Sequence, residues 1–174
     1  MDSVWIDRIW PLMEEAFPPV ERRSKAAQAA LFDSGRVSLR VAVQSGKTAG
    51  FLTWWELPSC RFAEHLAVDA SLRGAGLGPK LLKLACEKSK KPVVLEIEPP
   101  DSGELPRRRL NFYRRQGFFV NAFPYQQQPL NPGDKPIDLV LLSYPRALSA
   151  KEFSALKDEI YLKVYGVAPA MAAL

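Results

Sequence analysis

A glycine-rich turn between an apolar strand and an amphipathic helix is the sequence feature that most constrains the fold. Cys60–Val68 reads CRFAEHLAV, which predicts a strand, and the turn RGAGLG follows at Arg73–Gly78. Directly after it, the apolar side of a helix is formed by Leu81, Leu82, Leu84 and Ala85. The first N–H groups of a helix lack partners within it and hold the positive end of its dipole. The turn therefore predicts a site for an anion at the start of this helix.

The next strand indicates the fold class. Val93–Glu98 reads VVLEIE, and because a helix joins it to the Cys60–Val68 strand, the two are expected to be parallel neighbours with a right-handed crossover. Upstream, Ser38–Gln44 and Thr48–Leu57 are rich in β-branched and aromatic residues. They are separated by Ser45-Gly46-Lys47, which predicts an antiparallel hairpin. The sequence therefore predicts an α/β protein with a mixed sheet.

The N-terminal residues predict two helices. Apolar residues recur at fourfold spacing and stop at Pro18-Pro19, and Pro11 is expected to kink or split this first helix. A second helix is expected with Pro18-Pro19 in its first turn and its end at Asp33–Gly35. The two apolar stripes are Trp5, Ile9, Met13 and Phe17, and then Val20, Ala27, Ala30 and Leu31.

The C-terminal half predicts two more helices. Pro106 and Tyr113 lie at helical spacing, with Gly117 after the last turn. Ser149 and Glu152 have the spacing of a capping box, and the helix that they open has the apolar stripe Phe153, Leu156, Ile160 and Val164. Between the helices, the expected elements are a strand at Phe118–Asn121, a Pro- and Gln-rich loop at Ala122–Pro136 and a strand at Ile137–Ser143.

Length and charge limit the classes of function. The chain has 174 residues, 47% hydrophobic and 25% charged, which suits one globular domain. We expect a single domain over 1–174, with an additional C-terminal helix at 146–166 and a tail at 167–174. The formal charge is +5, and residues 73–115 hold 11 Lys and Arg against 5 Asp and Glu. The positive excess is therefore local, which favours a small polyphosphorylated ligand over a chain-wide nucleic-acid surface.

Other residue types exclude several kinds of site. Cys60 and Cys86 lack CxxC spacing and are expected to be reduced thiols. The one histidine excludes a site built from several His ligands, and no metal is expected. No apolar run approaches the ~20 residues that span a bilayer, and charged residues interrupt the N-terminal segment where a signal peptide would be apolar. The expected location is the cytoplasm.

Several classes of loop compete for the glycine-rich turn. A P-loop is excluded because no Gly-Lys-Ser/Thr follows. A dinucleotide fingerprint needs GxGxxG or GxGxxA, whereas residues 74–79 read GAGLGP, with Glu96 about 20 residues further on. A tight turn that binds nothing stays open as well. The remaining class is the pyrophosphate loop (Gln/Arg)xxGx(Gly/Ala), which Arg73–Gly78 matches.

That loop and a second motif together resemble the GNAT superfamily of N-acetyltransferases. The segment FYRRQGF at Phe112–Phe118 is similar to the family's second signature, a Tyr followed by Gly-Phe. The resemblance runs from about Val4 to Tyr144. It implies a GNAT acyltransferase fold, whose mostly antiparallel central sheet has a parallel pair splayed around the coenzyme A site and is flanked by helices. One departure is Pro106, which lies seven residues before Tyr113 where many members have Asn, so that residue's cofactor contact is unassigned here.

The resemblance implies an acetyl-CoA-dependent N-acetyltransferase, in which a primary amine attacks the thioester directly in a ternary complex. Backbone amides of the turn would bind the pyrophosphate, and the strand before it would pair with the pantetheine arm. Arg73 could add a charge-assisted bond to phosphate. The implied cofactor-binding residues are Leu66, Ala67, Val68, Arg73, Gly74, Ala75, Gly76, Leu77, Gly78 and Pro79.

Acetyl transfer needs an acid for the departing thiolate and a base for the amine. Tyr113 is the candidate acid, because a phenol with a pKa near 10 can protonate a thiolate near 8.5. A core tyrosine beside Leu110 is the alternative. A lysine-like amine is mostly protonated at pH 7, so a base or a water relay is expected. The candidate carboxylates are Glu64, then Glu98, then Glu96, with Glu56 also considered.

The same carboxylates have a simpler interpretation. Glu96 and Glu98 are expected to share one face of their strand, and either could instead form salt bridges to Arg107, Arg108 or Arg109. His65 is another candidate base, although a lone strand histidine is more typical of a packed, hydrogen-bonded residue.

The acceptor side is expected to involve the first two helices, the end of the hairpin and the Ala122–Pro136 loop. Candidate substrate-binding residues are Trp54, Glu56, Glu96 and Tyr125. Aromatic side chains there could bind a cation, although at least one tryptophan is expected to lie in the core. The expected partner is a small-molecule or peptide amine, with neither nucleic acid nor membrane; a homodimer stays open.

Two other functions remain open from the sequence. A GNAT domain could bind an acyl-CoA as a regulatory ligand without turnover. Alternatively, RRRLNFYRR at Arg107–Arg115 interleaves basic and aromatic residues, as in a nucleic-acid-binding module. The arginines spread around much of the helix, which favours a solvated surface.

Overall fold

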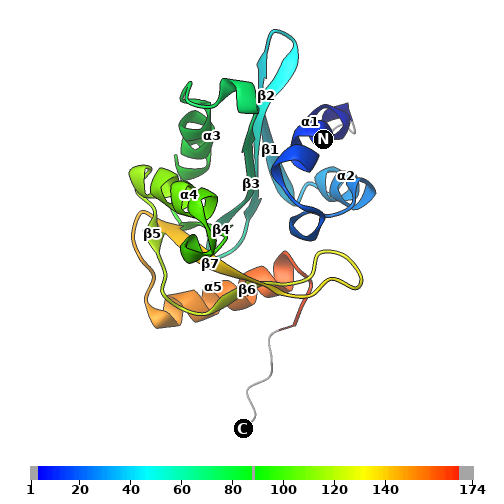
Figure 1. Cartoon of the computed structure of the whole chain (residues 1–174). Coiled ribbons are helices and arrows are strands. Elements are labelled where there is room, and N and C mark those ends of the chain that lie inside the picture. The colour runs from blue at the N-terminus through cyan, green and yellow to red at the C-terminus, as the bar shows by residue number, and fades with distance from the viewer. Residues whose placement is uncertain (1–3, 88, 169–174) are drawn as a thin grey trace. The chain divides into compact units, whose positions relative to one another are not determined.

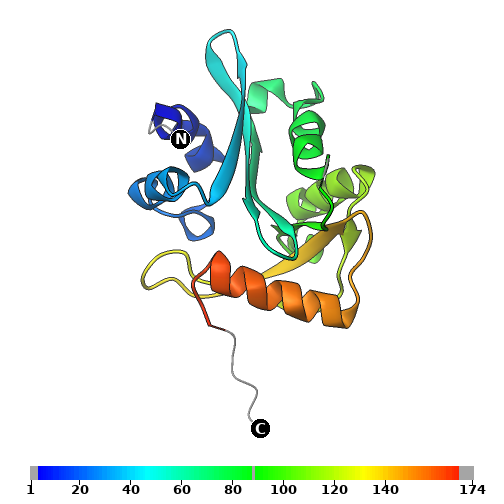
Figure 2. The ribbon, with the colours of Figure 1, turned by 180° about the vertical axis from the view of Figure 1, so that it is seen from behind.

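The computed structural model describes residues 4–87 and 89–168 (Figures 1 and 2). Within them, seven strands follow the order β1-β2-β3-β4-β7-β5, with β6 paired to β7 off this path. The pairing is mostly antiparallel with one parallel pair, and helices flank the strands. The mixed α/β class predicted from the sequence is therefore confirmed. The chain divides into two compact units: unit 1 is Met1–Glu56, Ala63–Ser89 and Leu130–Asp134, and unit 2 is Leu57–Phe62, Lys90–Pro129 and Lys135–Leu174.

Unit 1 is built on the predicted hairpin. Its strands pair antiparallel through a two-residue turn, in which Ser45 and Gly46 adopt left-handed φ of 50° and 77°. α1 and α2 lie on one face of the hairpin and α3 on the other, so Gly50–Trp55 is buried throughout (Figures 1 and 2). The elements are α1 Val4–Ala16, η1 Pro19–Glu21, α2 Lys25–Asp33, β1 Val37–Gln44, β2 Lys47–Glu56, β3 Arg61–Val68, η2 Ala70–Leu72 and α3 Leu77–Cys86.

Unit 2 is centred on β7, which pairs antiparallel with three strands. β4 aligns with it from Val93↔Tyr144 to Ile97↔Val140. The capping box at Ser149 is confirmed, and the predicted stripe of the last helix is buried. α4 lies against β4, while α5 packs on β6 through Tyr125 and Phe153, whose ring centroids are 6.3 Å apart. The elements are β4 Val93–Ile97, η3 Pro100–Ser102, α4 Glu104–Arg115, β5 Phe119–Val120, β6 Tyr125–Gln127, β7 Ile137–Tyr144 and α5 Ala150–Lys163.

The second predicted helix is wrong in its first half. α1 runs through Pro11 without being split, and the two prolines after it lead into a short 3-10 turn. α2 begins only after Ser24, whose Oγ accepts a hydrogen bond from the N–H of Ala27 at 3.2 Å. Its buried residues are Gln28, Leu31 and Phe32, whereas the predicted stripe residues Val20, Ala27 and Ala30 are exposed.

Two further expectations are corrected in detail. The Ala122–Pro136 loop contains the strand β6, because Tyr125–Gln127 pairs with Leu139–Ile137 of β7. Of the predicted apolar side of α3, Leu81, Leu82 and Ala85 are buried as expected, but Leu84 is exposed. None of the helices in residues 4–87 and 89–168 is long and apolar enough to cross a membrane. Most of the expected tail, residues 169–174, lies outside the described residues.

Candidate active site

The turn predicted to bind an anion is open on the side of its two central glycines. Gly74 and Gly76 adopt left-handed φ of 87° and 78°. A Cβ at either position would meet no heavy atom of another described residue within 4 Å, beyond its chain neighbours. Glycine is therefore required there by backbone conformation, and space lies beside the turn. Gly76 is the N-cap of α3, and no side chain caps this helix.

The backbone donors of the turn divide into two sets. Arg73 and Ala75 use their N–H groups within the turn, each donating to a carbonyl three residues back at 3.4 Å. The N–H groups of Leu77 and Gly78 fall in the first turn of α3, where a helix provides no acceptor. Donors at the positive end of a helix beside open space fit a phosphate group. The residues present therefore fit the pyrophosphate of coenzyme A.

Arg73 is an exposed residue at the start of the turn. Its Nε donates to the backbone oxygen of Val68 at 3.4 Å, across the 3-10 turn η2. Asp69 stabilises this bend, because its carboxylate accepts hydrogen bonds from the N–H of Ser71 at 2.8 Å and from its hydroxyl. The guanidinium is thus held next to the end of β3 and beside the turn.

A glycine in β2 sets how closely α3 approaches the sheet. At Gly50 a Cβ would lie 2.8 Å from the backbone oxygen of Ala67 and 3.2 Å from Cδ1 of Leu81. Any side chain at this position of β2 would push the strand away from the end of β3 and from α3, the helix that follows the turn. Leu66 and Val68, the other residues expected along the pantetheine arm, are half-buried on either side of Ala67.

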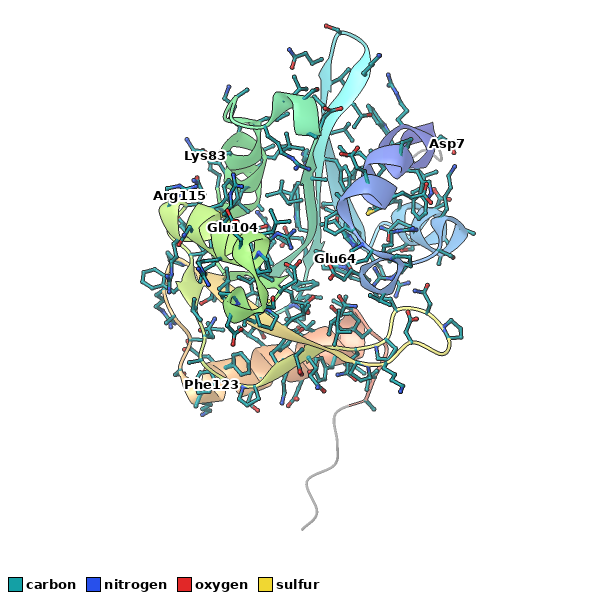
Figure 3. All side chains as sticks on the ribbon, viewed as in Figure 1. Asp7, Glu64, Lys83, Glu104, Arg115 and Phe123 are labelled. Atoms are coloured by element: carbon teal, nitrogen blue, oxygen red, sulfur yellow. The ribbon has the colours of Figure 1, made fainter. Side chains whose placement is uncertain are left out.

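Glu64 lies in a buried ion pair rather than at a solvated strand end. Its Oε1 is 2.6 Å from Nη1 of Arg23, and its Oε2 accepts the indole N–H of Trp55 at 2.9 Å. Only 5% of the Glu64 side chain and 11% of the Arg23 side chain are exposed, and Figure 3 shows Glu64 among the packed side chains beside β3. Burial alone would raise the pKa of Glu64, but the charge of Arg23 and the hydrogen bonds from Arg23 and Trp55 lower it below its ordinary value.

His65 is a packed, hydrogen-bonded residue, which is the simpler of the two sequence interpretations. Its Nε2 lies 3.0 Å from the carbonyl oxygen of Glu21, and its Nδ1 lies 3.4 Å from Oγ1 of Thr53. Because a carbonyl can only accept, the Glu21 contact requires the proton on Nε2. The ring also packs edge-on against Phe17 at 4.7 Å. Burial lowers the pKa of His65, which keeps the imidazole neutral.

Both tryptophans at the end of the hairpin are buried. Trp55 lies 5.6 Å from the guanidinium of Arg23 and 5.8 Å from that of Arg36. Trp54 donates its indole N–H to the exposed Glu56 at 3.0 Å. Trp54 and Glu56, two of the four residues proposed from the sequence to bind substrate, therefore form a hydrogen-bonded pair in unit 1. Glu96 and Tyr125 belong to unit 2.

Tyr113 lies on the inner face of α4, next to Leu110 and between aromatic rings. Its ring centroid is 5.0 Å from that of Phe112 and 5.8 Å from that of Phe118. Burial raises the pKa of Tyr113 to about 12; the charge of Arg109 opposes this rise and that of Glu98 adds to it. The phenol is therefore fully protonated at neutral pH.

Glu98 pairs with Arg109 of the helix that bears Tyr113, with side chains 31% and 42% exposed. β4 ends at Ile97, so Glu98 is the first residue after the strand, followed by Pro99 and Pro100. The salt bridge to Arg109 was one of the alternatives left open. The other arginines of α4 are exposed: Arg107, Arg108, Arg114 and Arg115. Lys83 of α3 and Arg115 of α4 reach outward in Figure 3.

Glu96 is bound by two tyrosines. It accepts a hydrogen bond from the hydroxyl of Tyr125, and the hydroxyl of Tyr165 lies 2.8 Å from each of its oxygens. Burial raises the pKa of Tyr125 well above its usual range, and the charge of Glu96 adds to this effect. The sequence singled out Glu96 and Tyr125 separately, and the structure brings them together.

Three functional candidates were missed from sequence. Arg23 lies 41 residues from its partner Glu64, and Tyr165 lies 69 residues from Glu96. Asn131, in the part of the Ala122–Pro136 loop that belongs to unit 1, donates to the carbonyl oxygens of Pro19 and Arg22 at 3.3 and 3.1 Å. No local pattern marks any of these contacts.

Comparison of this chain with known proteins shows that the fold and the glycine-rich turn are those of an acetyltransferase family. Residues 35–119 match the family described as acetyltransferase (GNAT) domain. YjbC of Bacillus subtilis (strain 168), which is provisionally named an acetyltransferase, is 30% identical over 155 residues, covering 88% of this chain and 79% of YjbC. The chain belongs to the GNAT acetyltransferase family, and the resemblance seen in the sequence is confirmed.

Solved structures agree with this assignment. A protein of Bacteroides thetaiotaomicron, provisionally assigned as a GNAT acetyltransferase, superimposes with a TM-score of 0.84 at 30% identity, over 94% of this chain and 93% of that one. An aminoglycoside 6'-N-acetyltransferase solved with coenzyme A has a TM-score of 0.60 at 14% identity, over 82% and 92% of the two chains. The latter shares the fold.

Proposed function

We propose that this protein is an acetyl-CoA-dependent N-acetyltransferase that moves the acetyl group to a primary amine in a ternary complex. Membership of the GNAT family supports the acetyl transfer, and solved neighbours bind coenzyme A. The observation that supports this chain's own use of the cofactor is the Arg73–Gly78 turn, with its open left-handed glycines and the first N–H groups of α3.

In this proposal the turn binds the pyrophosphate through backbone donors, and Arg73 adds a charge-assisted bond. The backbone of Leu66–Val68 pairs with the pantetheine arm. When bound, the thioester supplies an activated acyl group, so these residues need only hold its carbonyl carbon within reach of the amine. Gly50 keeps both parts of the cofactor site in place, because it allows the close approach of α3 and β3.

Tyr113 acts as the acid. The amine nitrogen bonds to the acyl carbon, the C–S bond breaks, and Tyr113 gives its proton to the sulfur to yield the free thiol. With its pKa near 12 against about 8.5 for a thiol, protonation of a fully formed thiolate would be uphill by about 5 kcal/mol. We therefore place the proton transfer during C–S cleavage, when the sulfur charge is still developing.

Glu98 is our candidate for taking up the amine proton, through water. It is partly exposed and lies close enough to Tyr113 to affect its pKa. Glu64 was ranked first from the sequence, but its two oxygens accept bonds from Arg23 and Trp55 and its pKa is lowered. Both properties make it a weaker base, so we propose that Glu64 anchors the segment after α1.

Thiol release from acetyl-CoA across a library of primary amines tests the activity. Coenzyme A affinity, measured by calorimetry, tests the turn separately. Gly76→Val should weaken binding at least tenfold, because a β-branched side chain at φ 78° distorts the turn. Gly35→Val is the matched control, since Gly35 has φ 70° and equally open surroundings outside the turn. Equal affinity of the two variants would exclude the cofactor site; binding without thiol release would indicate a regulatory ligand.

Tyr113→Phe tests the acid. The rate of thiol release should fall about 100-fold, in the range of general acid catalysis, while coenzyme A affinity stays within twofold. Tyr144→Phe, a half-buried tyrosine of β7, controls for loss of a hydroxyl. An unchanged rate for Tyr113→Phe would show that the proton comes from another group.

A further inference from the structure

Two tyrosines bind the carboxylate of Glu96 in unit 2, and the ring of a third packs against both of them. Tyr125 and Tyr165 donate their hydroxyls to it, from β6 and from the residues after α5. Tyr161, one turn before Tyr165, has its ring centroid 5.7 Å from that of Tyr125 and 6.3 Å from that of Tyr165. Tyr125 is buried, while Glu96, Tyr161 and Tyr165 are half-buried, so the cluster reaches solvent.

The cluster combines a carboxylate with aromatic faces, which is the chemistry that binds an alkylammonium group. Ring faces attract a cation through their quadrupole, and a carboxylate accepts charge-assisted hydrogen bonds from it. The protein itself shows this on the outer side of the cluster, where Nζ of Lys157 lies 5.9 Å from the ring centroid of Tyr161. A second carboxylate, Asp158, is near enough to act on the Tyr161 hydroxyl.

A group held here as a cation cannot be the nucleophile, because a proton occupies its lone pair. A monoamine bound only at Glu96 would therefore be held in its unreactive form. An acceptor with two amino groups resolves this conflict, since one can be bound as the ammonium while the other is attacked as the free base.

We infer that Glu96, with Tyr125, Tyr161 and Tyr165, binds an ammonium group of the acceptor that is not itself acetylated, so the acceptor is a primary amine with a second cationic amine. This inference rests on the proposed acetyltransferase function. It assigns recognition to Glu96 and leaves proton transfer to Tyr113 and Glu98. Tyr165 acts as a positioning residue, because its hydroxyl bridges both oxygens of the carboxylate.

Kinetics with matched acceptors test the inference. α,ω-Diaminoalkanes of three to six carbons are compared with the n-alkylamines of the same length. The best diamine should have a KM at least about tenfold below that of its monoamine, the factor expected of one charge-assisted contact. Glu96→Gln should remove this advantage by raising the KM of the diamine toward that of its monoamine. Tyr165→Phe should raise the diamine KM in the same direction by a smaller factor, with kcat unchanged.

Two results would overturn the inference. An equal fall of kcat for both amines in Glu96→Gln would make Glu96 a proton acceptor, and unchanged kinetics would leave the cluster as a support for α5. The matched control is Glu104→Gln, an exposed carboxylate of α4 in the same unit, which should change neither parameter.

A binding experiment keeps this test separate from the proposed function. Calorimetric titration with the same diamines, without acetyl-CoA, should show binding to the protein that Glu96→Gln weakens at least tenfold and Glu104→Gln does not. If no amine gives thiol release but this binding is seen, the acetyltransferase proposal fails and the cation site stands. If thiol is released and the Glu96-dependent binding is missing, the cation site fails and the acetyltransferase proposal stands.

Discussion

Replacing Glu64 by Gln removes the charge from a buried ion pair and leaves Arg23 uncompensated. Both side chains are largely buried, with 5% and 11% exposure. Breaking such a pair from one side costs about 3–5 kcal/mol, and we expect about 3 kcal/mol, because the amide oxygen of Gln can still accept one of the two hydrogen bonds. For a chain of this length, that corresponds to a fall in Tm of about 6–12 °C.

The stabilisation that Glu64 provides should depend on pH, and the direction of its pKa shift gives the sign of that dependence. The pKa of Glu64 is lowered on folding, so the unfolded chain binds the proton more tightly. The contribution of Glu64 is therefore present above its ordinary pKa of 4.5 and is lost as the pH falls through the lower value of the folded protein. The wild type and Glu64→Gln should differ most at pH 7 and converge in acid.

Urea denaturation at pH 7 and at pH 3.5 measures both effects. The control is Glu98→Gln, which breaks the more exposed pair with Arg109 and should cost less than about 1 kcal/mol. Equal midpoints for Glu64→Gln and the wild type at pH 7 would refute the reasoning. A folded Glu64→Gln protein whose thiol release is abolished would restore Glu64 as the catalytic base.

Three further predictions concern stability. Gly50→Ala should lower the free energy of unfolding by about 2 kcal/mol or more in thermal denaturation, because its Cβ would meet the backbone oxygen of Ala67 at 2.8 Å; a neutral effect would show that the sheet yields there. Ser149→Ala should cost about 1 kcal/mol by removing the capping box with Glu152, and an unchanged urea midpoint would contradict this. His65 is the chain's one histidine and burial lowers its pKa, so the free energy of unfolding should fall as the pH drops below 6.5, by up to about 1.4 kcal/mol per pH unit. In urea titrations between pH 7 and 5.5, His65→Gln should show no such slope. An equal slope in both proteins would exclude His65 as the group responsible.

The sequence predicted best where the determinants are local. The capping box of α5 depends on two residues three apart, and the hairpin depends on a two-residue turn between β-rich segments. The error in the start of α2 also has a local cause. The helix begins after Ser24, whose side chain caps it, and not at the two prolines where the sequence placed its first turn. β6 could not be recognised in a Pro- and Gln-rich loop, since its only support is pairing with β7.

The site divides in the same way. The glycine turn was found because its backbone conformation demands specific residue types in sequence order. The partners of Glu64 and Glu96 were not, because they come from other elements, whereas the pair of Glu98 with Arg109 was among the alternatives that the sequence offered. The alternation of residues along a strand predicts which face a side chain lies on. It does not predict whether an arginine or a tyrosine from another element binds that side chain. Ranking the bases therefore needed the folded structure.

The contact between Trp55 and Glu64 also gives the protein an intrinsic optical probe. The indole N–H of Trp55 lies on a carboxylate, and two guanidinium groups lie within 6 Å of its ring. Indole fluorescence responds to charges placed at its ends. A ligand that displaces Arg23 or the segment after α1 should change the emission of Trp55, so a Trp55→Phe difference spectrum would report that displacement in unlabelled protein.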